Sequence, residues 1–247
     1  MKSYYLTDKG MVRDHNEDSV VIINKDNVSL MAVADGMGGH SAGEVASTIA
    51  TNYLKEEFTK KFDNLDKVGA VNWIRDAFNE INKKIFDYEK SNPESKGMGT
   101  TLVLSIVTKD YILFGNVGDS SGFVMKDDHL HKVTYDHTLV NVLVSAGELT
   151  KEEAHHHPKK NVLMKALGAS LDVDVDIFDC ITDISSITLA SDGLTNMLDR
   201  EQIEKVLLSD DTVEEKVEKL IKKANNRGGT DNISVAYLVT SEVVDNG

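Results

Sequence analysis

Five aspartates stand where apolar stretches of this sequence begin or end. Asp18 precedes S-V-V-I-I and Asp231 precedes N-I-S-V-A-Y-L-V, whereas Asp35, Asp119 and Asp192 each follow an apolar stretch. Strand ends can converge at one edge of a sheet, where flexible neighbours allow backbones to approach closely. The spacing therefore raises the question of whether the five carboxylates form one cluster.

A cluster of carboxylates has a definite chemistry. Gathered carboxylates repel one another, and their pKa values rise unless cations neutralise them. Without thiolates they select hard cations such as Mg²⁺ or Mn²⁺, and two such ions can activate water and clamp a phosphoryl group. Aspartate before glycine is also common in turns. Taken alone, the spacing favours separate turn residues over a metal-binding cluster.

Strands are expected in the apolar stretches that flank these acids. The stretches are rich in Val, Ile, Leu and Thr and bounded by polar or turn residues; they cover residues 4–7, 19–23, 30–34, 101–107, 112–117, 173–178, 187–190 and 233–239. The strict alternation of D-V-D-V-D-I, residues 172–177, predicts a half-buried strand. We interpret Asp127-Asp128 as a hairpin turn rather than a ligand pair.

Helices are expected between the groups of strands. Ser41 and Glu44 match a capping box, which predicts a helix with one apolar face made of Val45, Ile49, Tyr53 and Phe58. A second helix is expected over about 66–90, with Ile74, Phe78, Ile81, Ile85 and Tyr88 on one face, and two more over about 200–208 and 212–225. Strands in groups and helices in pairs favour an α+β fold with antiparallel sheets over a doubly wound parallel sheet.

Length and composition limit the class of protein. The 247 residues suit one domain, and a single cysteine, Cys180, excludes a disulfide within the chain and favours a reducing compartment. The N-terminus does not resemble a signal peptide, and no apolar run reaches the ~18 residues of a membrane span, so we expect a cytoplasmic protein with no membrane partner. With 27 basic against 41 acidic residues, the net charge of −14 argues against nucleic acid binding.

Six motifs occur in a recognisable order along the chain: R-D-H-N-E-D (13–18), A-D-G-M-G-G-H (34–40), G-M-G-T-T-L-V (97–103), V-G-D-S (117–120), A-S-D-G-L (190–194) and G-T-D-N-I-S (229–234). Together they resemble the successive motifs of the metal-dependent protein serine/threonine phosphatases of the protein phosphatase 2C type (PPM family). The resemblance extends from Thr7 to Val239, and the absence of a long extension resembles the stand-alone bacterial members.

The resemblance implies a four-layer αββα sandwich, in which two antiparallel sheets are flanked by pairs of helices. It implies a single phosphatase domain over residues 1–241 followed by a polar tail, 242–247. Residues 135–168 resemble the family's flap subdomain, which borders the cleft and is the expected source of substrate selection.

The resemblance also implies a set of metal ligands for two Mn²⁺ or Mg²⁺ ions. Asp35 is expected to bridge both ions, the Gly36 carbonyl to bind one of them, and Asp192 and Asp231 to complete the other. A third Mn²⁺ or Mg²⁺ ion at Asp119 and Asp192 would match bacterial members. Asp18 is expected beside the ions or as a direct ligand, and Glu17 in a supporting position behind them.

Two further residues match the family's catalytic groups. Arg13 corresponds to the phosphate-binding arginine, and a fixed bidentate cation suits a phosphate dianion approaching an acidic protein. His40 corresponds to the general acid that protonates the leaving alkoxide. A water bridging the metals would be the nucleophile, so no catalytic cysteine is expected.

The resemblance leads us to expect phosphorylated proteins as substrates, a eukaryotic-type Ser/Thr kinase and its targets as natural partners, and a monomer. Two alternatives stay open. One is a pseudophosphatase that docks a partner through its flap; it predicts lost ligands or a lost Arg13, and the sequence shows neither. The other is the same chemistry on a small phosphoester.

Overall fold

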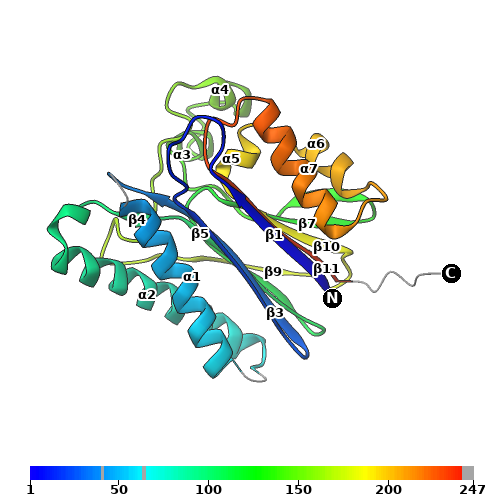
Figure 1. Cartoon of the computed structure of the whole chain (residues 1–247), viewed down its shortest axis with the longest axis horizontal. Coiled ribbons are helices and arrows are strands. Elements are labelled where there is room, and N and C mark those ends of the chain that lie inside the picture. Colours follow the sequence, from blue (N-terminus) through cyan, green and yellow to red (C-terminus); the bar gives the residue numbers. More distant parts are fainter. Residues whose placement is uncertain (40–41, 63–64, 241–247) are drawn as a thin grey trace.

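The computed structural model describes residues 1–39, 42–62 and 65–240. Two antiparallel sheets face each other in its centre, with helices on both outer surfaces (Figure 1). The expected α+β sandwich of two antiparallel sheets is therefore confirmed. The predicted tail and the capping residue Ser41 lie outside the described residues.

The first sheet has the strand order β1-β11-β10-β7-β8. Its strands are β1 (Lys2–Asp8), β7 (Ser121–Lys126), β8 (His129–Lys132), β10 (Ser186–Ala190) and β11 (Ile233–Val239). The turn between β7 and β8 is formed by Asp127 and Asp128, whose φ angles of 49° and 60° are those of a tight hairpin turn. This confirms the interpretation of the pair as a turn.

The second sheet has the order β2-β3-β5-β6-β9, with β4 paired to the end of β3. Its strands are β2 (Asp18–Lys25), β3 (Val28–Met37), β4 (Gly99–Thr100), β5 (Leu102–Thr108), β6 (Ile112–Val117) and β9 (Asp176–Cys180). The predicted strand over 173–178 is wrong at its start. Only residues that pair with β6, from Asp176 opposite Asn116 to Cys180 opposite Ile112, extend as a strand.

Helices cover the outer face of each sheet. The longer ones are α1 (Ala42–Lys61) and α2 (Lys67–Ser91) on one side, and α6 (Arg200–Leu207) and α7 (Val213–Asn226) on the other (Figure 1). A 3₁₀ turn, η1 (Pro93–Ser95), follows α2. Three short helices lie nearer one end of the sandwich (Figure 1): α3 (Leu139–Ser145), α4 (Lys151–His156) and α5 (Asp192–Thr195). None of the described helices is long and apolar enough to cross a bilayer.

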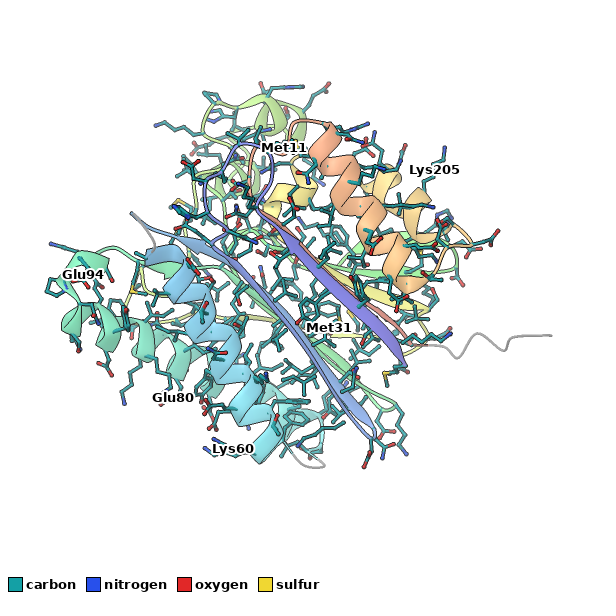
Figure 2. All side chains as sticks on the ribbon, in the orientation of Figure 1. Met11, Met31, Lys60, Glu80, Glu94 and Lys205 are labelled. Atoms are coloured by element: carbon teal, nitrogen blue, oxygen red, sulfur yellow. The ribbon has the colours of Figure 1, made fainter. Side chains whose placement is uncertain are left out.

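The alternation of side chains along each strand explains why one strand can contribute to two separate cores. In β3, Leu30, Ala32 and Ala34 join the core under α1 and α2, while Met31 and Val33 join the core between the sheets. Because successive side chains of a strand point to opposite faces, a strand buried on both sides is apolar throughout. Met31 lies in the middle of the molecule, whereas Lys60, Glu80, Glu94 and Lys205 lie on its outside (Figure 2).

Helix α2 buries all of its predicted face except the partly buried Tyr88, whereas only Phe58 of the predicted α1 face is fully buried. The residues of α1 that pack fully are mostly small, including Ala46 and Ala50, together with Leu54 and Phe58. Val45, Ile49 and Tyr53 are only partly buried. Small side chains allow α1 to lie close to the sheet, and this close approach, rather than the spacing of the largest residues, decides which face is covered.

We predict that Ala50→Leu lowers the free energy of unfolding by about 1–3 kcal/mol, because the added carbons overpack the contact of α1 with the sheet. Ile49→Leu, on the partly buried face, is the matched control and should cost less than about 1.5 kcal/mol. Urea titrations followed by circular dichroism measure both values. Equal losses in the two variants would contradict the assignment of Ala50 to the packed face.

Candidate active site

The hairpin formed by β2 and β3 places two of the five aspartates opposite each other. In its register Asp18, the first residue of β2, pairs with Asp35 near the end of β3. Asp18 is buried, with 8% of its surface exposed, and Asp35 is partly exposed. A single-residue shift of this pairing would separate the two carboxylates onto opposite faces.

The other sheet contributes two more aspartates from neighbouring strands. Asp192 is the first residue of α5, two residues after the end of β10, and Asp231 stands two residues before β11. The N–H group of Ser191 donates to the carbonyl of Ser234 (3.0 Å), so the two strands remain in contact at this end. The fifth aspartate, Asp119, follows β6 and is buried, with 9% exposed.

The charges that act on Asp35 indicate that all five acids lie close enough to influence one another. Burial raises the pKa of Asp35 well above its ordinary value, and the charges of the other four aspartates, Asp18, Asp192, Asp119 and Asp231, raise it further. The structure therefore brings together the five acids that the sequence placed at separate strand ends.

Burial is also the main reason why the pKa values of the aspartates beside Asp35 are raised. It raises the pKa of Asp18 and of Asp119 to about 7, and that of Asp192 to about 6. Repulsion from adjacent carboxylates contributes in each case, while the hydrogen bonds from Ser191 to Asp18 and from Asn196 to Asp192 act in the opposite direction. The pKa of Glu17 is raised by burial as well.

Three buried carboxylate oxygens of this cluster accept no hydrogen bond within the described residues. They are Oε1 of Glu17, Oδ1 of Asp18 and Oδ1 of Asp192. A buried anionic oxygen without a partner is costly unless a cation or water satisfies it. The donor set consists of oxygens alone and therefore fits hard divalent cations.

Three other carboxylate oxygens of the cluster contact protein groups. Asp18 Oδ2 accepts from Ser191 Oγ (2.8 Å), Asp192 Oδ2 accepts from Asn196 Nδ2 (2.9 Å), and Asp231 Oδ2 lies 2.8 Å from Arg13 Nη2. Among the described residues, no three acidic, histidine or cysteine side chains converge into a ready group of metal ligands.

Gly36 lies where the hairpin meets α1. Its N–H group donates to the carbonyl of Glu17 (3.1 Å). A Cβ at this position would lie 2.2 Å from the carbonyl oxygen of Gly43, in the first turn of α1. Only glycine therefore permits this close contact, and the structure places Gly36 and Glu17 beside Asp35, as the sequence motifs suggested.

Arg13 stands on the exposed loop between β1 and β2. Asn232 anchors this loop: its side-chain oxygen accepts from the N–H of Glu17 (2.9 Å), and its amide donates to the carbonyls of Lys9 (2.9 Å) and His15 (2.8 Å). The loop is thereby held against the start of β11, and Arg13 reaches Asp231. His40, the predicted general acid, lies outside the described residues.

Sequence reasoning missed the uncharged residues that hold the acids. Ser191 donates to Asp18 and accepts from the N–H of Ser234 (2.9 Å), and Thr101 Oγ1 accepts from the N–H of Asp35 (3.1 Å). Ser191 and Asn232 directly neighbour predicted acids in A-S-D-G-L and G-T-D-N-I-S. A buried polar residue next to an acid at a strand end is the signal that could have identified them.

A groove of about 420 Å³ extends from the carboxylates toward α3 and α4. Asp119 and Asp192 form its acidic end. The opposite walls come from the segment 132–161, including Lys132, Lys151 and Lys160. Lys132 is paired with Asp136 at 2.6 Å. The groove therefore joins the acid cluster to a wall that carries basic side chains.

Comparison with known proteins gives a consistent result. Residues 11–234 match the family model described as protein phosphatase 2C. The chain is 42% identical to the serine/threonine phosphatase stp of Listeria monocytogenes, an alignment that covers 100% of this chain and 98% of that protein.

Solved structures agree with the sequence match. The chain resembles the serine/threonine phosphatase Stp1 from Staphylococcus aureus with a TM-score of 0.91 and 35% identity, over 98% of this chain and 95% of that one. It also resembles the PPM Ser-Thr phosphatase MsPP from Mycobacterium smegmatis, solved in complex with cacodylate, with a TM-score of 0.82 and 30% identity over 97% of each chain.

The raised pKa values predict how stability depends on pH and on cations. An aspartate whose pKa is raised on folding binds more protons in the folded than in the unfolded protein, so stability falls as pH rises from about 4 to about 7. Divalent cations should reverse this loss. We predict that Mn²⁺ raises the melting temperature of the chelator-treated protein more at about pH 8 than at about pH 5.

Differential scanning fluorimetry measures this difference. Asp210→Asn changes an exposed acid in the loop between α6 and α7 and should respond to Mn²⁺ as the unmodified protein does. An equal stabilisation at both pH values would be inconsistent with cation binding by these buried carboxylates.

Proposed function

Because the chain belongs to the protein phosphatase 2C family and is a protein serine/threonine phosphatase, we propose that its five clustered aspartates, with Arg13 and His40, hydrolyse phosphoserine and phosphothreonine in proteins. The observation that carries this assignment is the convergence of buried and partly buried, mutually repelling carboxylates beside an arginine at one edge of the sandwich. The family is metal-dependent, and such a cluster is the kind of site at which divalent cations bind.

The chain's own oxygens would hold the ions. Asp35, the Gly36 carbonyl, Asp192 and Asp231 would bind two Mn²⁺ or Mg²⁺ ions, and Asp119 with Asp192 a third. Asp18 would be a further ligand or would support the others, together with Glu17. The unsatisfied oxygens of Asp18, Asp192 and Glu17 support this set. When bound, the ions would supply activation of the attacking water and neutralisation of phosphoryl charge.

Arg13 binds the phosphate of the substrate. The guanidinium has five N–H donors in a planar fork, and the only hydrogen bond recorded for it among the described residues is that of Nη2 to Asp231. The other donors are free to take phosphate oxygens. The salt bridge to Asp231 keeps the exposed side chain beside the acids.

His40 protonates the leaving group. Hydrolysis breaks the bond between phosphorus and the serine or threonine oxygen, and that alkoxide is a poor leaving group unless it receives a proton. A histidine can hold such a proton near neutral pH and pass it to the departing oxygen. It has no role in binding the ground-state phosphate in this scheme.

The groove toward α3 and α4 receives the polypeptide around the phosphorylated residue. Residues 135–168 form its outer wall and act as the flap of a single domain, 1–241. Lys151 and Lys160 line this wall and offset the acidic end. The protein acts as a monomer, and its substrates are the products of a Ser/Thr kinase, because that reaction supplies phosphoserine and phosphothreonine.

Asp35→Asn should lower turnover of a phosphothreonine peptide and of p-nitrophenyl phosphate by about 1000-fold, because several kcal/mol of charge stabilisation depend on this carboxylate. Rates are measured with Mn²⁺ by release of inorganic phosphate and of nitrophenol. Asp210→Asn is the control for loss of one surface charge. Near-normal rates in Asp35→Asn would overturn the assignment of the site.

His40→Gln should distinguish the two substrates. The phosphothreonine peptide should react about 100-fold more slowly, since its alkoxide needs the proton, whereas p-nitrophenyl phosphate should be affected much less, since nitrophenolate leaves without one. Substitution of His131, exposed on β8, by Gln should leave both rates unchanged. Equal losses for both substrates would argue against a general acid.

A further inference from the structure

His137 is a buried histidine that the proposed reaction does not use. It belongs to the stretch D-H-T, which follows β8 and opens the segment 135–168. Only 7% of its surface is exposed, although histidine is usually less completely buried than this. Its ring must therefore satisfy both nitrogens within the protein.

Two hydrogen bonds join His137 to Gly118, the residue before Asp119. Ring nitrogen Nδ1 accepts from the N–H of Gly118 (3.0 Å), and the N–H of His137 donates to the carbonyl of Gly118 (2.9 Å). Both polar groups of one peptide residue are thus held by one histidine. The amide of Asn116 adds a longer bond to the same carbonyl (3.3 Å).

Gly118 needs such support because its conformation is unusual. Its φ angle is 113°, a value that side-chain-bearing residues rarely adopt. A Cβ there would lie 2.5 Å from Cβ of Thr101. The flexible backbone of glycine permits this turn but does not enforce it. The direction in which Asp119 leaves β6 therefore depends on the groups that bind Gly118.

The hydrogen bonds determine the state of the imidazole ring. A backbone N–H can only donate, so Nδ1 of His137 carries no proton when it accepts from Gly118. The ring is then neutral, with its proton on Nε2, which donates to Oδ2 of Asp176 at 3.1 Å. The contact with Asp176 is thus a hydrogen bond rather than an ion pair, and the cation beside that carboxylate is Lys165, 3.9 Å from Oδ1.

The same histidine connects both ends of the segment that borders the groove. Its carbonyl accepts from the N–H of Met164 (2.8 Å), and the next residue, Thr138, forms a β-bridge with Leu163. The entry and exit of the segment thus meet beside Gly118. Asp176 fixes the other side of the ring to β9.

We propose that His137, as the neutral tautomer protonated on Nε2, is a positioning residue that fixes the Gly118–Asp119 turn. Through this residue, the orientation of the Asp119 carboxylate depends on the position of the segment 135–168. The part of the inference that concerns cation binding rests on the proposed function of Asp119. The part that concerns the hydrogen bonds of the ring is independent of the proposed function.

The first test examines the ring itself in the ¹⁵N-labelled protein without added metal. The ¹⁵N shifts of the ring nitrogens should identify Nδ1 as unprotonated and Nε2 as protonated. A scalar coupling across the hydrogen bond should connect Nδ1 of His137 with the amide nitrogen of Gly118. A protonated Nδ1, or no coupling to Gly118, would overturn the proposal whatever the activity of the enzyme.

The second test separates the two sides of the ring. In His137→Asn the side-chain oxygen takes the place of Nδ1 and can still accept from Gly118. In His137→Gln the amide reaches the place of Nε2 and can donate to Asp176, but it has no acceptor near Gly118. We expect titration calorimetry to show Mn²⁺ binding about tenfold weaker in His137→Gln and close to normal in His137→Asn.

Asn82→Ala is the matched control for loss of a buried polar anchor. Asn82 accepts from the N–H of Gly168 (2.7 Å) and donates to the carbonyl of Ser170 (2.9 Å), and it forms no hydrogen bond with Gly118 or His137 among the described residues. The Asn82→Ala substitution should lower the melting temperature of the protein without changing its affinity for Mn²⁺. Equal Mn²⁺ affinities in His137→Gln and Asn82→Ala would show a merely structural role and overturn the proposal.

Asp119→Asn distinguishes failure of this inference from failure of the proposed function. If Asp119→Asn and His137→Gln both bind Mn²⁺ more weakly, the result supports the cation site at Asp119 and the positioning role of His137. If Asp119→Asn binds Mn²⁺ normally, the cation site at Asp119 is wrong and the coupling of His137 to metal binding falls with it. The phosphopeptide rates of Asp35→Asn then still test the proposed reaction separately.

Discussion

The central constraint on this protein is that several carboxylates are held together where water cannot fully solvate them. Burial and mutual repulsion both oppose their ionisation, as the raised pKa values of Asp18, Asp35, Asp119 and Asp192 show. A protein with 14 more acidic than basic residues has little positive charge with which to relieve this repulsion. Arg13 supplies one positive charge at the cluster, and protonation or bound cations would relieve the remaining repulsion.

The sandwich provides the rigidity that such a cluster needs. One sheet contributes Asp18 and Asp35 through a paired hairpin, and the other contributes Asp192 and Asp231 from adjoining strands. The apolar core between the sheets fixes their relative position, with Met31 at its centre (Figure 2). Repelling groups on flexible loops would move apart, whereas groups at the ends of packed strands cannot do so without disrupting that core.

The anchors of the site are mostly uncharged. Ser191, Asn232 and the neutral ring of His137 hold the loops and carboxylates by hydrogen bonds without neutralising the acids. Lysines at these positions would stabilise the cluster by themselves and compete with divalent cations. Neutral anchors preserve the geometry and leave the negative charge available for metal binding, as expected of groups that support metal ligands.

The amino-acid sequence alone determined the features that depend on neighbouring residues. The positions of the acids at strand ends, the buried face of α2, the turn at Asp127-Asp128 and the α+β class all follow from local periodicity and residue type. The motifs, through their resemblance to a family, also indicated the residues of the site. The hairpin turn was predicted but the extents of its strands, β7 and β8, were not, because the short, mixed polar and apolar sequence of β7 becomes buried only through its sheet partners.

Only the tertiary structure decided which distant residues meet. The register that sets Asp18 opposite Asp35, the start of β9 at Asp176 and the small-residue face of α1 are set by partner strands and packing surfaces far away in the chain. The same holds for His137, whose ring joins Gly118 to Asp176 across 19 and 39 residues. Local sequence specifies what a side chain can bind, but distances between remote side chains arise from packing the whole core.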